Sequence, residues 1–474
     1  MAYAAGWVAD GAPPAEFLDL VNEWALHQMP VVNREIADGR SPRAAFGLDL
    51  DRNVLAHLPS TELLNPGQAQ QLVVILGLAG AAVGRHYQES DQAHRATPEQ
   101  AFAGLTAGPG SEPFLSYFAR LAERTGTGHA NRDSYASLVR WNVPRVEVRH
   151  AGQLIAALPS VFDDGLVRSY TGAPDEIRFF GLLKASEVLE KAVNQELGPL
   201  SDGSMDLADD AALRRIARAV MLLDTLRELN SHFAGRPPEQ GLSVGFFLDV
   251  FRQYAVHWRP DDIPPSGAQD VEAMARDLIV GTTVPSYPAH LRRMFPALLD
   301  DERVRLESLM NRPSLPETAL RRAGLDAAQL SRCSESELHE LICRYPVLAA
   351  LHLLLNAHAR LAGVHLMLSK RFLFHPQRLR DLSGLGDPGV VSNRTGTTGM
   401  DETRLEALTR ARHEHVLAPL RHLSTLDAAA RPPRIESDLP PSTEISVRFA
   451  SSVLTPQDLG LAGSAGRPSS ERRN

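Results

Sequence analysis

The stretch YPVLAALHLLLNAHARLAGVHLMLSKRFLFHPQ, residues 345–377, decides the fold. Its apolar residues recur three and four positions apart, which predicts a long helix buried in a core. The helix carries three histidines and is followed by a polar Gly/Thr loop, NRTGTTGMD, at residues 393–401. A buried imidazole on a rigid helix beside a flexible polar loop is the arrangement that a metal or haem site needs.

The rest of the chain shows the same helical periodicity and little of the alternation that is typical of strands. We therefore expect an all-α fold. The predicted helical segments are residues 15–29, 68–87, 112–124, 132–141, 175–197, 210–233, 243–258, 269–280, 300–310, 335–374 and 401–424.

The order of these segments and the breaks between them predict two helical domains. We expect a smaller N-terminal domain over residues 1–125, a linker that carries one helix over 126–173, and a large domain over 174–430. Residues 431–474 include RPPRIESDLPPSTEIS and GSAGRPSSERRN. Because so little apolar surface cannot offset chain entropy, we expect most of this tail to be flexible.

Composition excludes several classes of protein. The 474 residues are 43% hydrophobic, enough for a large globular core. A net charge of -8 argues against nucleic acid and membrane partners, and the N-terminus lacks the pattern of a signal sequence. The only cysteines, Cys333 and Cys343, fit a reducing compartment, so we expect a cytoplasmic protein. Two cysteines at this spacing also exclude a Cys-rich zinc site and covalent haem attachment.

Three short motifs have structural explanations. Ser243, in GLSVG, matches a hydrolase nucleophile motif but follows a loop, so it is predicted to be a helix N-cap. The GLGDPG motif at residues 384–389 follows no strand, so we interpret it as a connecting loop. His413 and His415 lie on opposite sides of a helix, which makes a shared metal ion improbable.

The three histidines of the long helix have two possible roles. His358 and His365 are seven residues apart and share one helix face, whereas His352 lies elsewhere, so at most one or two of them face a common site. Each can instead be a core histidine that is paired with a backbone carbonyl or a carboxylate. The basic residues that follow, among them Lys370 and Arg371, could meet haem propionates or form a solvated helix end.

Aromatic residues accompany an arginine in the helix SVGFFLDVFRQYAVHW, residues 243–258. Phe247, Phe251, Tyr254 and Trp258 form one stripe, and Arg252 lies at its edge. The Arg252 guanidinium could bind a carboxylate, or it could be solvated or paired within the protein. A second aromatic pair, Phe179 and Phe180, begins another apolar helix, where paired aromatics usually belong to the core.

Taken in order, these segments resemble the indoleamine 2,3-dioxygenase family of the haem-dependent tryptophan dioxygenase superfamily. The double-Phe distal segment of the family is similar to RFFGLL at residues 178–183, and its F-x-x-x-x-R element to residues 247–252. Its proximal histidine segment is similar to HLMLSKRFLF at 365–374, and its G-T-G-G-T-D loop, the most specific match, to GTTGMD at 396–401. Residues 134–141 resemble its distal-side helix.

This resemblance implies a two-domain helical haem enzyme. His365 would be the axial ligand of a b-type haem, and Leu183 and Arg371 would contact the cofactor. Substrate contacts would come from Arg252 to a carboxylate, from Thr397 and Gly396 in the loop, and from Phe179 and Phe247 around an indole ring. The family chemistry is insertion of both atoms of O2 across the indole C2–C3 bond, with the Gly-rich loop closing over the substrate.

The sequence departs from the family pattern at several positions. Leu183 replaces a small polar residue of the distal pocket, residues 259–290 contain no clear counterpart of a Gly/Ser/Ala-rich segment, and Thr398 and Met400 alter the loop. The alternatives are a haem enzyme that rearranges a substituted tryptophan, as in the branch resembling monodechloroaminopyrrolnitrin synthase, and a non-catalytic helical scaffold. A haem-based gas sensor would need a fused signalling module, for which the tail is too short.

Overall fold

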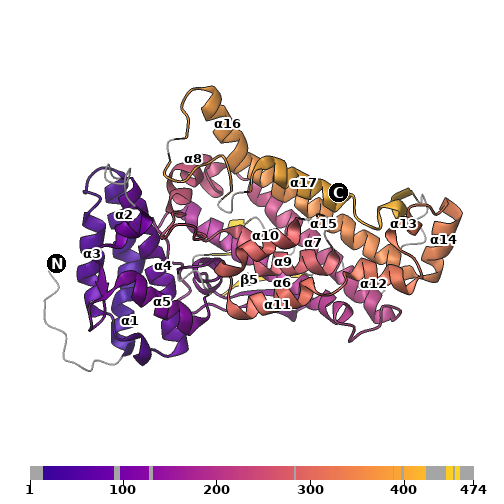
Figure 1. Ribbon diagram of the computed structural model, residues 1–474, viewed down its shortest axis with the longest axis horizontal. Helices are drawn as coiled ribbons and strands as arrows, with labels where there is room; N and C mark the ends of the chain where they lie inside the picture. The colour runs from indigo at the N-terminus through magenta and orange to yellow at the C-terminus, as the bar shows by residue number, and fades with distance from the viewer. Residues whose placement is uncertain are drawn as a thin grey trace, which may run out of the picture.

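The computed structural model describes residues 14–89, 97–127, 132–281, 284, 286–387, 389–396, 400–422, 445–451 and 454–459, most of them helical, as predicted. Figure 1 shows α1 to α5 grouped at one end of an elongated molecule and α13 and α14 at the other. The helices are α1 (Pro14–Glu23), α2 (Met29–Ala37), α3 (Ala45–Asn53), α4 (Pro66–Gln88), α5 (Phe114–Thr125), α6 (Pro174–Ser201), α7 (Asp210–Gly235), α8 (Val244–Phe246), α9 (Val271–Val280), α10 (Tyr287–Met294), α11 (Asp300–Met310), α12 (Leu315–Arg322), α13 (Ala327–Leu330), α14 (Glu335–Arg344), α15 (Pro346–Ser369), α16 (His375–Leu382) and α17 (Glu402–His413). The strands are β1 (Thr106–Ala107), β2 (Glu112–Pro113), β3 (Val146–His150), β4 (Gln153–Leu158) and β5 (Ile445–Phe449).

The N-terminal helices have a hydrophobic core of their own, built around α4. This helix begins at a capping box in which Asn65 and Gln68 exchange hydrogen bonds, and nearly all of its apolar residues are buried. Glycines on α4 let other segments approach closely. A Cβ atom at Gly80 would lie 2.3 Å from Cζ2 of Trp258. Trp258 ends the segment 243–258 that carries Arg252, called the arginine segment below, so the end of this segment is inserted against α4.

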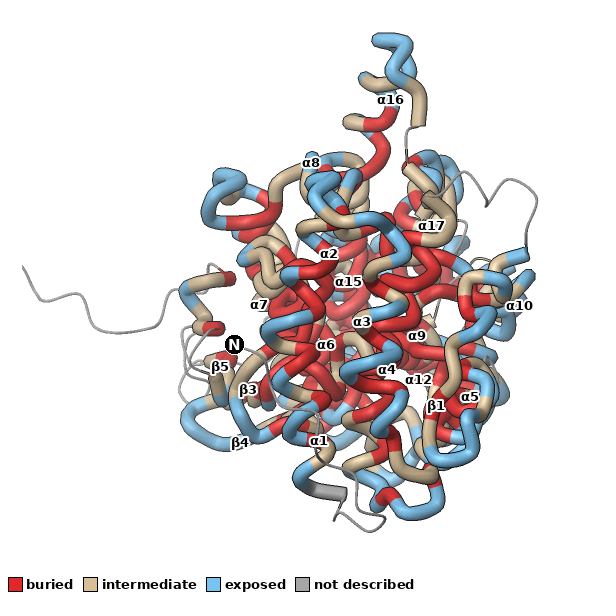
Figure 2. Tube along the Cα trace, turned by 90° about the vertical axis from the view of Figure 1, so that its left-hand side faces the viewer, coloured by how far each residue is buried: buried red, intermediate tan, exposed pale blue. Residues whose placement is uncertain are grey.

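The second core lies between the long helices α6, α7 and α15. α6 packs on α7 and α9, and α15 packs on α7 and α17. Figure 2 shows the buried residues concentrated on these helices, while α16 projects from the body. The segment 335–374, predicted as one helix, is divided at Tyr345, where α14 ends and Pro346 starts α15. Proline cannot continue a helix from the preceding turn, which explains the break.

Two segments are apolar enough to cross a membrane by length and composition, namely α4 and the continuous helical stretch Pro346–Leu382. Their most apolar windows are 78% and 67% buried inside the protein. The two hydrophobic cores described above account for this apolar character.

A small antiparallel sheet was missed at the sequence level. Its strand order is β4-β3-β5, and the β3–β4 hairpin turns at Ala151 and Gly152, which have φ values of 49° and 79°. β5 belongs to the tail that was predicted to be flexible, and that prediction is wrong for residues 445–451 and 454–459. Val447 and Leu454 are buried, and β5 pairs along the whole of β3, so long-range pairing supplies what the local composition lacks.

Candidate functional site

One cavity of about 430 Å³ collects most of the predicted site residues. Its walls come from α6, α9, α15, α17 and the segment 242–255. Ligand cavities in proteins typically enclose roughly 300–1,000 Å³, so this one is large enough for a small molecule. The predicted residues that line it are Phe179, Leu183, Phe247, Arg252, His365 and Gly396. Thr397 lies outside the described residues.

His365 differs from the other two histidines of α15. His352 Nδ1 lies 3.0 Å from the Leu417 carbonyl oxygen, and His358 Nε2 lies 2.8 Å from Asp277 Oδ1, so both are the core histidines of the structural alternative. His365 has no hydrogen-bond partner for either ring nitrogen among the described residues. His365 is an exposed residue of the cavity wall, so its ring is open to a ligand there. The protein packed around the ring, and then the charges of Arg412 and Arg276, lower the pKa of His365 to about 4, so the ring is neutral at pH 7.

A buried charged network lies beside this ring. Asp277 on α9 accepts hydrogen bonds from the hydroxyl of Tyr287 and from Nη2 of Arg412, each at 2.6 Å. The pKa of Asp277 is well below its usual range: burial, which would raise it, is outweighed by Arg412, His358 and Arg276. The ionised carboxylate of Asp277 on α9 therefore holds Arg412 of α17, and this contact joins the two helices on one side of the cavity.

Arg252 lies at the end of a π-helical turn, Phe247–Phe251. Such turns are rare and occur often at functional sites. Its side chain is 5% exposed and donates hydrogen bonds to the carbonyl oxygens of Ser392 and Thr395, at 2.6 and 2.7 Å, and to Oδ1 of Asn393 at 3.0 Å. All three partners are neutral, and no carboxylate pairs with this guanidinium among the described residues. Burial lowers the pKa of Arg252 to about 10, so the charge remains at neutral pH.

Aromatic rings form the apolar wall next to Arg252. The centroid of the Phe179 ring lies 5.6 Å from that of Phe247 and 5.3 Å from that of Phe251, both in edge-to-face geometry. This arrangement suits the face of another planar ring, because aromatic pairs favour edge-to-face and offset contacts. This part of the cavity therefore combines an aromatic wall with a buried positive charge.

Three small residues that were not predicted as site residues also line the cavity, namely Ser266, Gly267 and Ala268. A Cβ atom built on Gly267 would lie 3.5 Å from Leu183 Cδ2, so this segment lies beside Leu183. The signal in the sequence was the short run PSGA between two acidic stretches.

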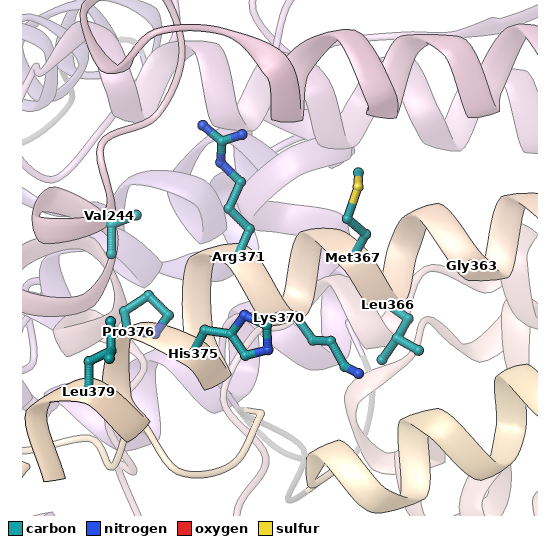
Figure 3. Close-up of a pocket in the computed structure, with 9 residues that line it drawn as sticks. All are labelled: Val244, Gly363, Leu366, Met367, Lys370, Arg371, His375, Pro376 and Leu379. Atoms are coloured by element: carbon teal, nitrogen blue, oxygen red, sulfur yellow. The ribbon is translucent and has the colours of Figure 1, made fainter. Parts of the chain in front are cut away.

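Arg371 lies outside this cavity. It is exposed and lines a separate apolar groove of about 700 Å³ on the outer side of α15 and α16, where Figure 3 shows it extending away from His375. The neighbouring basic residues have acidic partners. Lys370 pairs with Glu406, Arg378 with Glu402, and Arg380 with Asp249. These contacts match the alternative of a charged helix end.

The structural interpretation of Ser243 is confirmed, because its side chain accepts a hydrogen bond from the backbone N–H of Phe246 at the start of α8. Within the described part of the chain, no group of three or more His, Cys, Asp or Glu side chains is placed to hold a metal ion. A haem iron needs only one protein ligand, so this finding bears on multidentate metal sites alone.

Comparison with protein-family models and with curated proteins finds no match to this chain.

Proposed function

We propose that this protein is a haem-dependent oxygenase that acts on tryptophan or a tryptophan-derived indole. One observation carries the proposal: His365 and Arg252 line the same cavity. Among the described residues the imidazole has no hydrogen-bond partner, and the guanidinium is bonded to no carboxylate, although the charge of Asp387 acts on it. A neutral imidazole can coordinate iron, and a buried guanidinium that is not directly paired with a carboxylate favours an anionic ligand.

One residue of the cavity has the chemistry to hold a haem group. His365 would hold a b-type haem through one ring nitrogen, and the bound iron would supply the O2 chemistry for insertion across the indole C2–C3 bond. Arg276 and Arg412 also line the cavity but are already paired with Glu190 and Asp277. We therefore assign no partner to the haem propionates.

The protein's own side chains would bind and orient the substrate. Arg252 would hold the carboxylate through a charge-assisted hydrogen bond from Nη1, which has no partner among the described residues. Phe179 and Phe247 would pack against the indole ring, and Leu183 with Gly267 would exclude water from the ring edge. Gly396, which follows the carbonyl groups that hold Arg252, links substrate binding to the position of the loop.

A haem titration of the purified protein tests this proposal. We expect a Soret band on adding haem, loss of most of it in His365→Ala, and partial recovery when imidazole is added to His365→Gly. His375→Ala is the matched control, because His375 is exposed in the outer groove of the same helical stretch (Figure 3) and should leave the band unchanged. Equal haem content in His365→Ala and the parent would remove the axial-ligand assignment.

The second candidate is rearrangement of a substituted tryptophan at the same site. Leu183 favours testing it, because a leucine at the distal position offers no hydroxyl to the ligand. Incubation of the reduced, haem-loaded protein with tryptophan and O2 separates the candidates. A formylkynurenine product supports dioxygenation, whereas haem binding without that product favours the rearrangement.

A further inference from the structure

The end of the cavity that lies away from Arg252 is polar. Phe179, Leu183, Ser186 and Glu190 all line the cavity from one face of α6. At about 1.5 Å per residue, Glu190 lies roughly 16 Å along the helix from Phe179, which contacts the arginine segment. Asp270, at the start of α9, lines the same cavity, and the charge of Glu190 helps to raise the pKa of its carboxyl group.

Glu190 has one oxygen atom without a partner. The residue is 7% exposed, and its Oε1 accepts a hydrogen bond of 2.8 Å from Nη1 of Arg276. Its Oε2 is fully buried and has no hydrogen-bond partner among the described residues. Buried polar atoms in folded proteins are rarely left unsatisfied, so this end of the cavity is built for a further polar group.

Asp270 differs from the other acidic residues of this region in its hydrogen-bond partners. Its Oδ1 caps α9 by accepting from the backbone N–H groups of Glu272, at 2.9 Å, and Ala273, at 3.2 Å. Its Oδ2 makes no hydrogen bond to another described residue. Nearby acids each have an arginine partner, as Glu187 has Arg140 and Glu272 has Arg305, whereas Asp270 has none among the described residues.

The surroundings of Asp270 favour its protonated form. Burial is the largest cause that raises the pKa of this carboxyl well above its usual range, followed by the charges of Glu190 and Glu187 on α6 and of Glu272 on α9. Tyr135 precedes a second π-helical turn, Ala136–Trp141, which packs on α6. The charges of Glu187, Asp270 and Glu190 also act on its hydroxyl group. A carboxylic acid that stays neutral in an enclosed site can donate a hydrogen bond, which a carboxylate cannot do.

We propose that Asp270 is a ligand-binding residue of this cavity, where its carboxyl donates a hydrogen bond to an uncharged oxygen of the bound molecule. The ligand group is a carbonyl or hydroxyl oxygen, because the acids around Asp270 disfavour an anion. The inference rests on the proposed use of this cavity as the ligand site. It requires neither haem nor Arg252.

Two neutral fragments test it, indole and oxindole, which differ by a carbonyl oxygen and lack the carboxylate that Arg252 would bind. We expect the parent to prefer oxindole in an NMR titration, and Asp270→Gly to lose roughly tenfold of that preference, the effect of one hydrogen bond. Glycine has no side-chain donor and is tolerated at helix N-caps, so α9 should remain folded. Asp326→Gly, at the exposed cap of α13, is the matched control.

The dependence on pH gives a second readout. In the parent the preference is present below the raised pKa of Asp270 and falls as the pH rises through it, because the donor proton is then lost. Asp270→Asn should keep the preference at every pH, since its amide N–H donates without titrating. Leu183→Trp fills the cavity and should abolish binding of both fragments.

Three results would overturn the inference: an unchanged preference in Asp270→Gly, binding of the fragments to Leu183→Trp as to the parent, or no binding of either fragment to the parent. Because the fragments need neither iron nor Arg252, failure of haem binding would count against the proposed function only. Failure of the oxindole preference would count against Asp270 only.

Discussion

Arg252 shows most clearly what a single residue contributes here. The sequence left three readings open, namely a carboxylate partner, solvation and pairing within the protein. In the structure the side chain is buried and is held by neutral oxygens of residues 392–395. These contacts could not be foreseen, because two of the three acceptors are backbone carbonyl groups and all three lie in a loop about 140 residues away, whose conformation no local pattern encodes.

Replacing Arg252 should separate ligand binding from cofactor binding. We expect Arg252→Ala to keep haem and to weaken tryptophan binding by about 2–5 kcal/mol, because a desolvated charge pair is lost. Tryptamine, which lacks the carboxylate, should bind the variant and the parent alike. The dissociation constants of both ligands are the measurement.

Arg394→Ala is the control for this experiment, since Arg394 lies in the same loop but is half exposed and pairs with Asp381. Arg252→Lys keeps the charge while losing the planar fork, so it should fall between Ala and the parent. If Arg252→Ala weakened tryptophan and tryptamine equally, Arg252 would only support the loop.

At the scale of elements, helix periodicity predicted nearly every long helix but not the contacts between helices. The segment 243–258 was predicted to be one helix, whereas the structure breaks it into α8, a π-helical turn and a 3₁₀ turn that ends at Tyr254. The spacing of the apolar residues predicts that one face of a helix is buried. It does not report that Trp258 inserts against Gly80 of α4, because that contact depends on two segments far apart in the chain.

The contact between Gly80 and Trp258 should tolerate no added atom. Gly80→Ala would place a Cβ atom 2.3 Å from the Trp258 ring, and both residues are buried, so we expect a loss of about 1–3 kcal/mol in the free energy of unfolding. Because Trp258 ends the segment that carries Arg252, tryptophan affinity should fall as well. Denaturant unfolding and a tryptophan titration measure the two effects.

Gly363→Ala provides the comparison, because nothing lies within 4 Å of a Cβ atom at that position in α15. Alanine is the better helix former, so this variant should be unchanged or more stable by up to about 1 kcal/mol. Equal effects of the two substitutions would mean that Trp258 can move aside at little cost.

At the scale of the whole molecule, the described residues of the C-terminal tail contact two elements that were predicted to belong to different regions, β3 and α6. β5 completes the sheet with β3, and Leu454 packs against Gly181 of α6, where a Cβ atom would lie 2.9 Å from Leu454 Cδ2. Leu454 is 1% exposed and belongs to the hydrophobic core of the N-terminal helices. The tail therefore supports the helix that carries Phe179 and Leu183.

Truncating Leu454 should show how much stability this contact contributes. We expect Leu454→Ala to lower the free energy of unfolding by about 2–5 kcal/mol, because it leaves a cavity in a closed core. Leu385→Ala, at a residue that is 71% exposed, should change it little. A small loss in Leu454→Ala, comparable to that of Leu385→Ala, would show that the tail is dispensable for the core.

Six of the eight predicted site residues lie together. Phe179, Leu183, Phe247, Arg252, His365 and Gly396 were chosen by their resemblance to motifs of a known family, and they line one cavity. Arg371 lies outside that cavity, and Thr397 lies outside the described residues. Asp270 and residues 266–268 were missed, because a cap of a short helix and three small residues carry no local chemical signal. Their role depends on α9 packing against α6, which the sequence of α9 alone does not specify.

The contact between Gly181 and Leu454 also orders events during synthesis. At roughly 5–20 residues per second, a ribosome needs on the order of tens of seconds to pass from the first of these positions to the second. Over that interval α6 lacks the leucine that covers Gly181, so this contact can form only after residue 454 has been synthesised. If haem binds as proposed, it would meet a fully covered α6 only once translation has passed that residue.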